Sequence, residues 1–169
     1  TGADTFKYWS DGNGAWRRAN TAVGTTFEHR AVVVSGTGAG AGTFYLNGAT
    51  DGTFTQTAPG SFTGTKRIGS RSDATRFWDG GLAHLAVWNI ALSAVEIEMH
   101  RRGLLPRLNS LVGYWGLFGT VSPEPDWSGN NNHGTLTGTT RIDHPPGISA
   151  VWLAPHPRLS QVAAAAVAA

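Results

Sequence analysis

Short runs of apolar and β-branched residues alternate with turns rich in glycine and asparagine along much of the chain. Residues 29–35 (HRAVVVS), 43–48 (TFYLNG) and 82–89 (LAHLAVWN) have the residue types and lengths of β-strands. In 82–89 both of the alternating faces are largely apolar. The pattern therefore predicts a strand buried on at least one face at 29–35 and a central strand at 82–89.

Dipeptides that favour tight turns separate these runs. The segment 11–14 (DGNG) lies between aromatic residues and predicts a hairpin within residues 1–28. Asn47-Gly48 supplies the positive φ angles of a type I′ hairpin turn. We expect a short returning strand after it, and then a further turn at Asp51-Gly52.

Other segments complete the strand pattern. The glycine run at 36–42 (GTGAGAG) lacks the Gly-Lys-Ser/Thr ending of a phosphate-binding loop, so it predicts a flexible connection between strands. The remaining expected elements are short strands at 66–69 (KRIG) and 135–138 (TLTG), a core strand at 111–119 (LVGYWGLFG) and a polar loop at 122–134.

One short helix is expected to begin at Ser93. Ser93 and Glu96 have the spacing of a capping box, in which each side chain accepts from the other residue's backbone N–H. Basic residues near 101 and a glycine at 103 are typical of a helix end. A helix of about ten residues decorates a β-fold and does not indicate alternating α/β units.

Composition narrows the class of protein. The chain has 169 residues, 23 of them glycine, with 14% charged residues, which fits one turn-rich all-β domain. The net charge of +2 gives no electrostatic argument for nucleic-acid binding. The chain has no cysteine, which excludes disulfides and cysteine-ligated metals. No apolar run reaches the roughly 20 residues of a membrane span.

Three segments resemble the laminin-G-like domain of the concanavalin A type. They are FEHRAVVVSG followed by GTFYLNG, then RIGSR followed by RFWDGGLAHLAVWNIALSAVEI, and finally LVGYWGLFG followed by PDWSGNNNHGTLTG. The second carries the most specific motif, and here His84 stands where the family usually has an acidic residue. The third usually stands at the start of such a domain, so here it either closes the sandwich or begins a truncated repeat. The segment from 122 onward also resembles the ends of phage-type surface proteins.

The resemblance implies an all-β, two-sheet antiparallel jelly-roll sandwich with one short helix. We expect this domain to span residues 1–145, and residues 146–169 to form a tail or arm rich in proline and alanine. Because Thr1 is not a natural start, we expect a mature or partial chain whose domain can lack its N-terminal part.

The sequence gives little support for catalysis. Glycosidases of this fold place two carboxylates about 5–9 Å apart, but the Glu96/Glu98 pair lies in the expected helix, where residues two apart diverge. No G-x-S-x-G motif is present, and the six histidines are dispersed. On its apolar strand, His84 is expected to be a core histidine with a hydrogen-bond partner. We therefore expect a protein that is not an enzyme.

Calcium is the one cofactor that the sequence suggests. Asp126 and Asn130, in the segment DWSGNNN, could supply the oxygen ligands that calcium prefers, and many members of the resembling family bind it. The alternative is that both side chains hold turns by hydrogen bonds to the backbone.

Two loop tryptophans are candidates for sugar binding. Trp127 and Trp78 each lie beside an aspartate and a glycine-containing turn, and Asp79 is the acid next to Trp78. Trp88 and Trp115 lie in expected core strands and are interpreted as packing residues. Trp78 could also pack, because the resembling family usually has an aromatic residue there.

Taken together, these features favour a non-catalytic module that binds a glycan or another surface protein, on an extracellular protein or a virion. The alternative is a structural protein that assembles with copies of itself, such as a capsid decoration or fibre subunit. A glycoside hydrolase is a third, weaker hypothesis.

Overall fold

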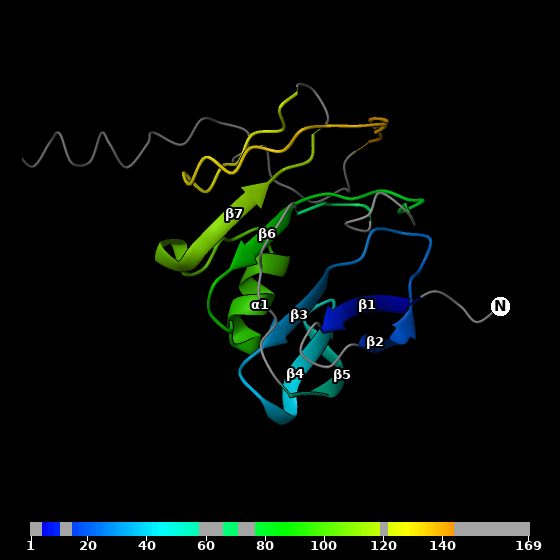
Figure 1. Cartoon of the computed structure of the whole chain (residues 1–169), viewed down its shortest axis with the longest axis vertical. Coiled ribbons are helices and arrows are strands. Elements are labelled where there is room, and N and C mark those ends of the chain that lie inside the picture. The colour runs from blue at the N-terminus through cyan, green and yellow to red at the C-terminus, as the bar shows by residue number, and fades with distance from the viewer. Residues whose placement is uncertain (1–4, 11–14, 58–65, 71–76, 119–121, 144–169) are drawn as a thin grey trace, which may run out of the picture.

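A computed structural model describes residues 5–10, 15–57, 66–70, 77–118 and 122–143 (Figure 1). These residues form seven strands, one α-helix and one short 3-10 helix. In chain order they are β1 (Thr5–Ser10), β2 (Ala15–Ala22), β3 (Arg30–Val34), β4 (Gly38–Leu46), β5 (Ala49–Gln56), β6 (Leu85–Trp88), α1 (Ala94–Arg101), η2 (Leu108–Ser110) and β7 (Leu111–Trp115).

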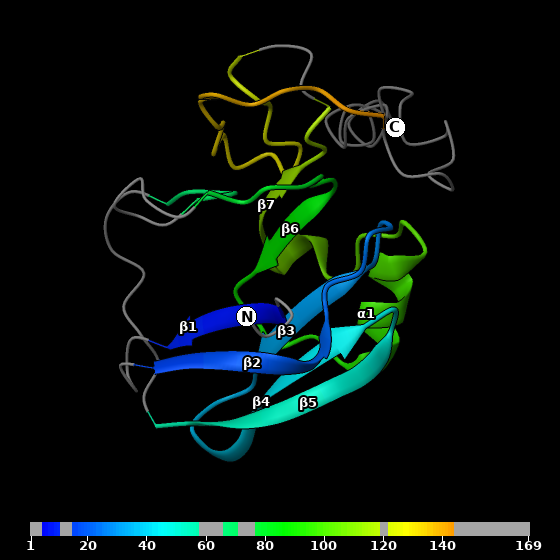
Figure 2. The ribbon, with the colours of Figure 1, turned by 90° about the vertical axis from the view of Figure 1, so that its right-hand side faces the viewer.

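All strand pairs are antiparallel, as the sequence predicts. The described strands form three small sheets, ordered β1-β2, β3-β4-β5 and β6-β7. Figure 2 shows the β1-β2 hairpin beside the three-stranded sheet, with β6 and β7 at the other end of the molecule. The prediction of an all-β antiparallel fold with a single short helix is confirmed.

The hydrophobic core lies between the β1-β2 hairpin and the three-stranded sheet. Phe44 of β4 is fully buried and meets Phe6 of β1 edge to face, with ring centroids 5.9 Å apart. Phe54 of β5 and Ala19 of β2 complete the buried cluster. The hairpin therefore provides the second layer over this sheet, because packed aromatic rings from both sides exclude water.

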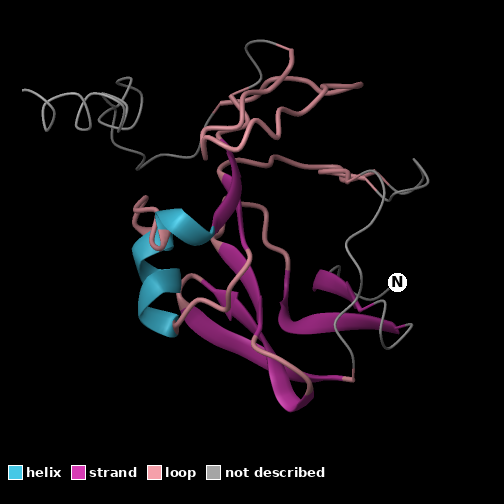
Figure 3. Ribbon diagram, turned by 60° about the vertical axis from the view of Figure 1, so that its left-hand side comes forward, coloured by secondary structure: helices cyan, strands magenta, loops and turns pink. Residues whose placement is uncertain are grey.

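The helix begins as its capping box predicts. Ser93 accepts a hydrogen bond from the Glu96 backbone N–H, and Glu96 accepts one from the Ser93 backbone N–H. Leu92, just before the cap, and Ile97 are buried. Gly103 has φ of +84°, the left-handed conformation that ends many helices. In Figure 1 α1 lies beside β3 and below β6 and β7, and Figure 3 shows the helix in cyan at one side of the strands.

The prediction that 36–42 is a flexible connection is wrong for most of its length. Strand β4 begins at Gly38, and its register with β5 shifts between Gly38 and Gly42. Gly40 has φ of +72°, which suits such a bulge. A side chain at Gly42 would overlap the Phe54 ring. These glycines serve close packing and an irregular strand, a role that local sequence does not distinguish from a loop.

The turn predicted at Asp51-Gly52 is also wrong, whereas the turn at Asn47-Gly48 is confirmed. Asn47 and Gly48 both have positive φ, 49° and 86°, between β4 and β5. Strand β5 runs on through Asp51 and Gly52, and the register shifts there because Thr43 pairs with Thr53 and Tyr45 with Thr50. Gly52 has φ of +114°, so the dipeptide forms a bulge that turns the Asp51 side chain inward.

Three strand predictions need correction in length or kind. The expected central strand at 82–89 is shortened to β6, because His84 has φ of +53° and breaks the alternation. Within the described residues β6 pairs only with β7, so it is not central. Residues 66–69 and 135–138 are not strands; only the isolated bridges Ser70–Phe77 and Glu124–Gly134 occur near them.

The third resembling segment folds back on the second. Strand β7, its opening strand, pairs with β6, so within this chain it closes onto the preceding strand. The strand predicted at 111–119 is confirmed over Leu111–Trp115. The predicted turn at 11–14 and the tail at 146–169 lie outside the described residues, and the 1–145 domain boundary stays a prediction.

Candidate functional site

The segment that carries most of the predicted site follows β7. We call residues 126–133 the Asp126 loop. Two isolated bridges, Trp115–Asp126 and Glu124–Gly134, fix its two ends. In Figure 2 it lies among the yellow loops above β7, away from the three-stranded sheet.

The Asp126 carboxylate organises this loop. Its Oδ1 accepts hydrogen bonds from the backbone N–H groups of Tyr114 and Ser128, both at 2.9 Å. Its Oδ2 accepts from the Ser128 hydroxyl at 2.9 Å and from the Asn132 backbone N–H at 3.0 Å. Burial alone would raise the pKa of Asp126, but these hydrogen bonds outweigh it and hold the pKa below its ordinary value.

Asparagine side chains fasten the same loop to β7. The Asn130 amide donates to the carbonyls of Leu111 and Val112, at 2.7 and 3.1 Å. The Asn132 amide also donates to Val112, at 2.8 Å, and the Trp115 indole donates to the Asn132 carbonyl at 2.8 Å. The side of β7 that does not face β6 is thus covered by side-chain donors, which satisfies backbone carbonyls that an edge strand would otherwise expose.

Trp127 is held at its backbone and free at its side chain. Its N–H donates to the Tyr114 carbonyl at 2.8 Å, while 59% of the residue is exposed. The exposed His133 accepts the Asp126 backbone N–H at its Nδ1, 3.0 Å away, which leaves the proton of the neutral ring on Nε2. The loop therefore presents an aromatic face and a polar ring on a backbone whose shape is already set.

The arrangement does not fit a calcium ion as it stands. Both oxygens of Asp126 already accept two hydrogen bonds each, and the Asn130 amide nitrogen is turned to β7. Calcium needs about six to eight oxygen ligands. Among the described residues, no group of three or more metal-binding acids or histidines gathers. Calcium binding by Asp126 and Asn130 stays a prediction, and it would require the loop to exchange its donors for the ion.

Trp78 and Asp79 lie in a different segment. The Trp78 backbone N–H donates to the Gly69 carbonyl at 2.7 Å, and both side chains are exposed. Between the described residues of the two segments, no hydrogen bond, ion pair or ring contact joins Trp78 or Asp79 to the Asp126 loop. The three predicted ligand-binding residues therefore do not form one site by direct contact.

Trp78 instead belongs to an exposed apolar surface. The side chains of Phe27 and Ile142 lie over Gly81, and Leu82 and Trp78 lie beside Gly69. Phe77 is 74% exposed. We call the exposed apolar residues of these neighbouring segments the Trp78 patch, and they are Phe27, Ile68, Phe77, Trp78, Leu82 and Ile142.

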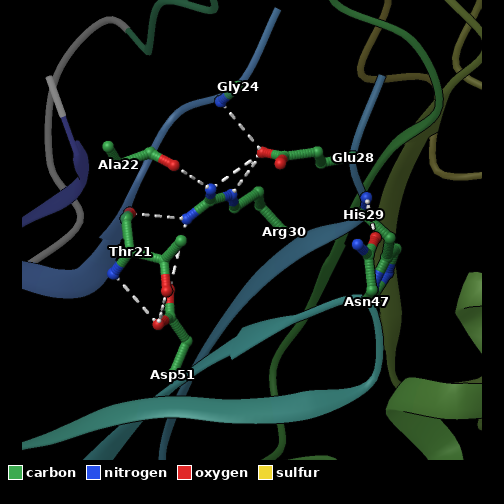
Figure 4. A network of polar contacts seen from close by, with 8 residues as sticks. All are labelled: Thr21, Ala22, Gly24, Glu28, His29, Arg30, Asn47 and Asp51. Carbon is green, nitrogen blue, oxygen red and sulfur yellow. Dashed lines mark hydrogen bonds and ion pairs between the residues drawn. The ribbon is translucent and has the colours of Figure 1, made fainter. Parts of the chain in front are cut away.

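A second polar centre, which no sequence pattern predicts, joins β2, β3 and β5 (Figure 4). These strands belong to the larger half of the molecule, formed by β1 to β5. Arg30, at the start of β3, donates from Nη1 to Asp51 Oδ2 at 3.2 Å and to the Thr21 carbonyl at 3.1 Å. Its Nη2 donates to the Ala22 carbonyl at 2.7 Å and to Glu28 at 2.8 Å. Its Nε also donates to Glu28, at 3.1 Å.

Asp51 completes this centre from the bulge of β5. Its Oδ1 accepts from the Thr21 backbone N–H at 3.0 Å and from the Thr21 hydroxyl at 2.6 Å. All five N–H groups of the Arg30 guanidinium can thus be matched to acceptors, which makes the centre a clamp between β2, β3 and β5. The only sequence signal was a single arginine at the head of an apolar strand.

The carboxylates near these arginines are not placed for acid catalysis. The hydrogen bonds from Arg30 lower the pKa of Glu28. Glu96 accepts from Ser93 and Arg107, and Glu98 from Arg101 and Arg102, so each has a pKa of about 2. A general acid at neutral pH needs a raised pKa, the opposite of what these contacts produce. The prediction that Glu96 and Glu98 are separated on the helix is confirmed.

His84 has the partner that the sequence predicts. Its Nδ1 lies 2.7 Å from the Tyr114 hydroxyl, and it meets Phe118 edge to face. Trp88 and Trp115 are half-buried, and each indole N–H donates to a backbone carbonyl, of Pro106 and Asn132 respectively. Their interpretation as packing residues is consistent with these contacts.

Comparison with known proteins places the fold in a family. No curated protein and no solved structure matches the chain. The family model described as the concanavalin A-like lectin/glucanases superfamily, of the laminin G type, matches residues 1–98. This match includes the first two resembling segments and ends within α1, before β7 and the Asp126 loop. The chain therefore belongs to the concanavalin A-like lectin/glucanase superfamily.

Proposed function

We propose that this chain is a non-catalytic module that binds a glycan or another surface protein, and that the Asp126 loop is its contact surface. Laminin-G-like domains generally bind glycans or proteins and are commonly extracellular, while the wider superfamily also contains glycosidases. The observation that carries the proposal is an exposed Trp127 on a backbone whose carboxylate, amides and N–H groups are already engaged.

Pre-ordering is what makes this loop suited to binding. A ligand that stacks on the Trp127 ring would not have to order the loop first, so less of the interaction energy is lost to entropy. Hydrophobic ring faces of sugars stack on indoles, and Asn131 and His133, which are exposed in the same loop, offer polar groups for hydroxyls. The same surface could also anchor a protein, because exposed tryptophan is enriched at interface hot spots.

An oligosaccharide array tests this proposal. Labelled wild-type protein is expected to bind a discrete set of the immobilised glycans. Trp127→Ala is expected to lose this binding without a change in melting temperature, because the side chain is exposed. Arrays of immobilised surface proteins are the second arm. Retention that is equal for wild type and Trp127→Ala, or no retention on either array, would overturn the proposal.

The proposed absence of catalysis has its own support. Glu28, Glu96 and Glu98 are held as ions by arginine or backbone donors, which leaves them poor proton donors at neutral pH. Incubation with the array glycans in solution is expected to release no reducing sugar.

Self-assembly is the second candidate, and the Trp78 patch favours it. Six large apolar side chains are exposed on neighbouring segments, and a cluster of exposed apolar side chains is typical of a protein–protein contact. A structural protein of a virion or cell surface would bury this patch against a second copy. Light scattering of the wild type and of a Phe77→Ser/Trp78→Ser variant tests this. A wild type that dimerises with rising concentration, together with a variant that stays monomeric, supports assembly. A wild type that is monomeric at every concentration rejects it.

Within the described residues, no helix has the length and apolarity required to cross a bilayer.

A further inference from the structure

Two histidines meet where α1 packs against the three-stranded sheet. His29, just before β3, and His100, in the last turn of α1, face each other with Nε2 and Nδ1 3.0 Å apart. Both rings are half-buried, and Trp88 of β6 packs edge-on against His100 with centroids 5.2 Å apart. The contact therefore lies at the junction of β3, α1 and β6.

This hydrogen bond depends on both rings being able to share one proton. One imidazole nitrogen must donate and the other accept, which two neutral rings can do. If both rings are protonated, two N–H groups face each other at hydrogen-bond distance and two positive charges repel. A singly protonated pair still forms this hydrogen bond, because an imidazolium N–H can donate to the neutral ring, so acid makes the contact repulsive once the second ring is protonated.

The charged groups around the pair oppose protonation further. Burial and then the Arg101 charge lower the pKa of His29, with Glu98 acting in the other direction. Burial, His29 and His84 lower the pKa of His100 to about 4. Because both folded pKa values lie below the ordinary 6.5, the neutral pair stabilises the packed state above about pH 6.5. That stability is lost as the pH falls towards 4.

The other polar contacts of α1 do not titrate in that range. Glu96 and Glu98 have pKa values of about 2, so their bonds to Ser93, Arg101, Arg102 and Arg107 persist at pH 5. The Trp88 indole bond to the Pro106 carbonyl carries no ionisable group. The internal structure of the helix thus survives acid while its attachment to the sheet weakens.

We propose that the His29–His100 contact is an acid-sensitive latch that holds α1 on the β3-β4-β5 sheet at neutral pH and releases it in mild acid. Because α1 joins β6 to β7, release also frees the sheet that carries the Asp126 loop to move relative to the core of β1 to β5. The latch does not depend on what the Asp126 loop binds.

Hydrogen exchange on the intact chain tests the latch. Protection factors, corrected for the intrinsic pH dependence of exchange, are compared for α1 and β4 at pH 7 and pH 5. The pKa of His100 is about 4 in the folded chain and 6.5 in its ordinary, exposed state. From this difference the opening equilibrium constant of α1 should increase by up to about thirtyfold at pH 5, while that of β4 should change little. Equal changes in α1 and β4, or none in either, would overturn the proposal.

Variants that keep the hydrogen bond but cannot titrate sharpen the test. In His29→Gln/His100→Asn the amides stand near Nε2 and Nδ1, so α1 is expected to stay protected at pH 5. His133→Asn removes a histidine of the Asp126 loop, outside the contact, and the response of α1 protection to acid, the one readout of this control, should stay that of the wild type. If the double variant does not fold, single His100→Asn and the titration of the His29 and His100 ring resonances in the wild type replace it. Ring pKa values at or above 6.5 would contradict the latch.

Discussion

The two halves of the molecule are each organised around a buried aspartate, but the two carboxylates are satisfied differently. Asp51, 6% exposed, binds the Arg30 guanidinium and Thr21, which come from other strands. Asp126, 7% exposed, binds only neutral donors from its own loop and from the adjoining β7. Asp51 thus joins strands into the core, whereas Asp126 shapes one loop.

This difference predicts how far damage should spread. Loss of Asp51 leaves the largely buried Arg30 cation with one fewer counter-charge between β2, β3 and β5, so the whole fold is destabilised. Loss of Asp126 leaves backbone N–H groups that water can reach once the loop opens. The first should appear in global unfolding and the second in loop order and binding.

The largest effect is expected for Asp51→Ala. Removing one partner of a buried ion pair costs about 3 kcal/mol or more, because the remaining charge stays buried. Urea unfolding measures the change. Asp79→Ala is the matched control, since this aspartate is exposed and should shift stability by no more than about 0.5 kcal/mol. Equal stability of the two variants would contradict the clamp.

A smaller effect is expected for Asp126→Ala. Four hydrogen bonds are lost, but water can replace part of them, so we expect a cost of about 1–3 kcal/mol. Trp127 should also become more mobile, which the linewidth of its own 19F NMR resonance measures in protein labelled with fluorotryptophan, the resonance being assigned by its loss in Trp127→Phe. An unchanged linewidth would show that Asp126 does not order the loop.

As the pH falls, the His29–His100 contact should be lost before the hydrogen bonds of the Asp126 carboxylate. The histidine latch loses its stabilisation between about pH 6.5 and 4, whereas the folded pKa of Asp126 lies below its ordinary 3.8. Since that carboxylate stabilises the fold above its unfolded pKa, its contribution is lost only as the pH falls further, through its folded value. Circular dichroism and hydrogen exchange should show α1 released before the Asp126 loop.

The smallest effect is expected from metal removal. Because the Asp126 oxygens are already hydrogen-bonded, EDTA should leave the melting temperature unchanged, and added calcium should not raise it. A calcium-dependent rise that Asp126→Ala abolishes would instead establish the metal site predicted from the sequence and show that the loop rearranges around the ion.

Local signals in the sequence predicted local structure well. Asn47-Gly48 and the Ser93/Glu96 capping box act within a few residues, and both were found where expected. Asp51-Gly52 carries the same kind of signal but forms a bulge, because its conformation is set by pairing with β4. The Arg30–Asp51 pair spans 21 residues of sequence, and no local pattern encodes that meeting.

In the candidate site, too, contacts between sequence neighbours were predictable and contacts between distant segments were not. Asp126 and Asn130 are candidates from one short segment, and in the fold both are bonded to Ser128 of that segment, while their role as metal ligands stays a prediction. Trp78 is a candidate because of its neighbours in sequence, but its backbone is bonded to Gly69, and Phe27 and Ile142 lie over the nearby Gly81 from far along the chain. Only the folded chain shows that it lies on a separate apolar surface.

The most direct test of the central claim compares the two exposed tryptophans on one oligosaccharide array. Wild type, Trp127→Ala and Trp78→Ala are first matched by melting temperature and then applied at equal concentration. We expect Trp127→Ala to lose binding to the glycans that the wild type binds, and Trp78→Ala to keep it. Loss with Trp78→Ala and retention with Trp127→Ala would contradict the assignment of the binding surface to the Asp126 loop.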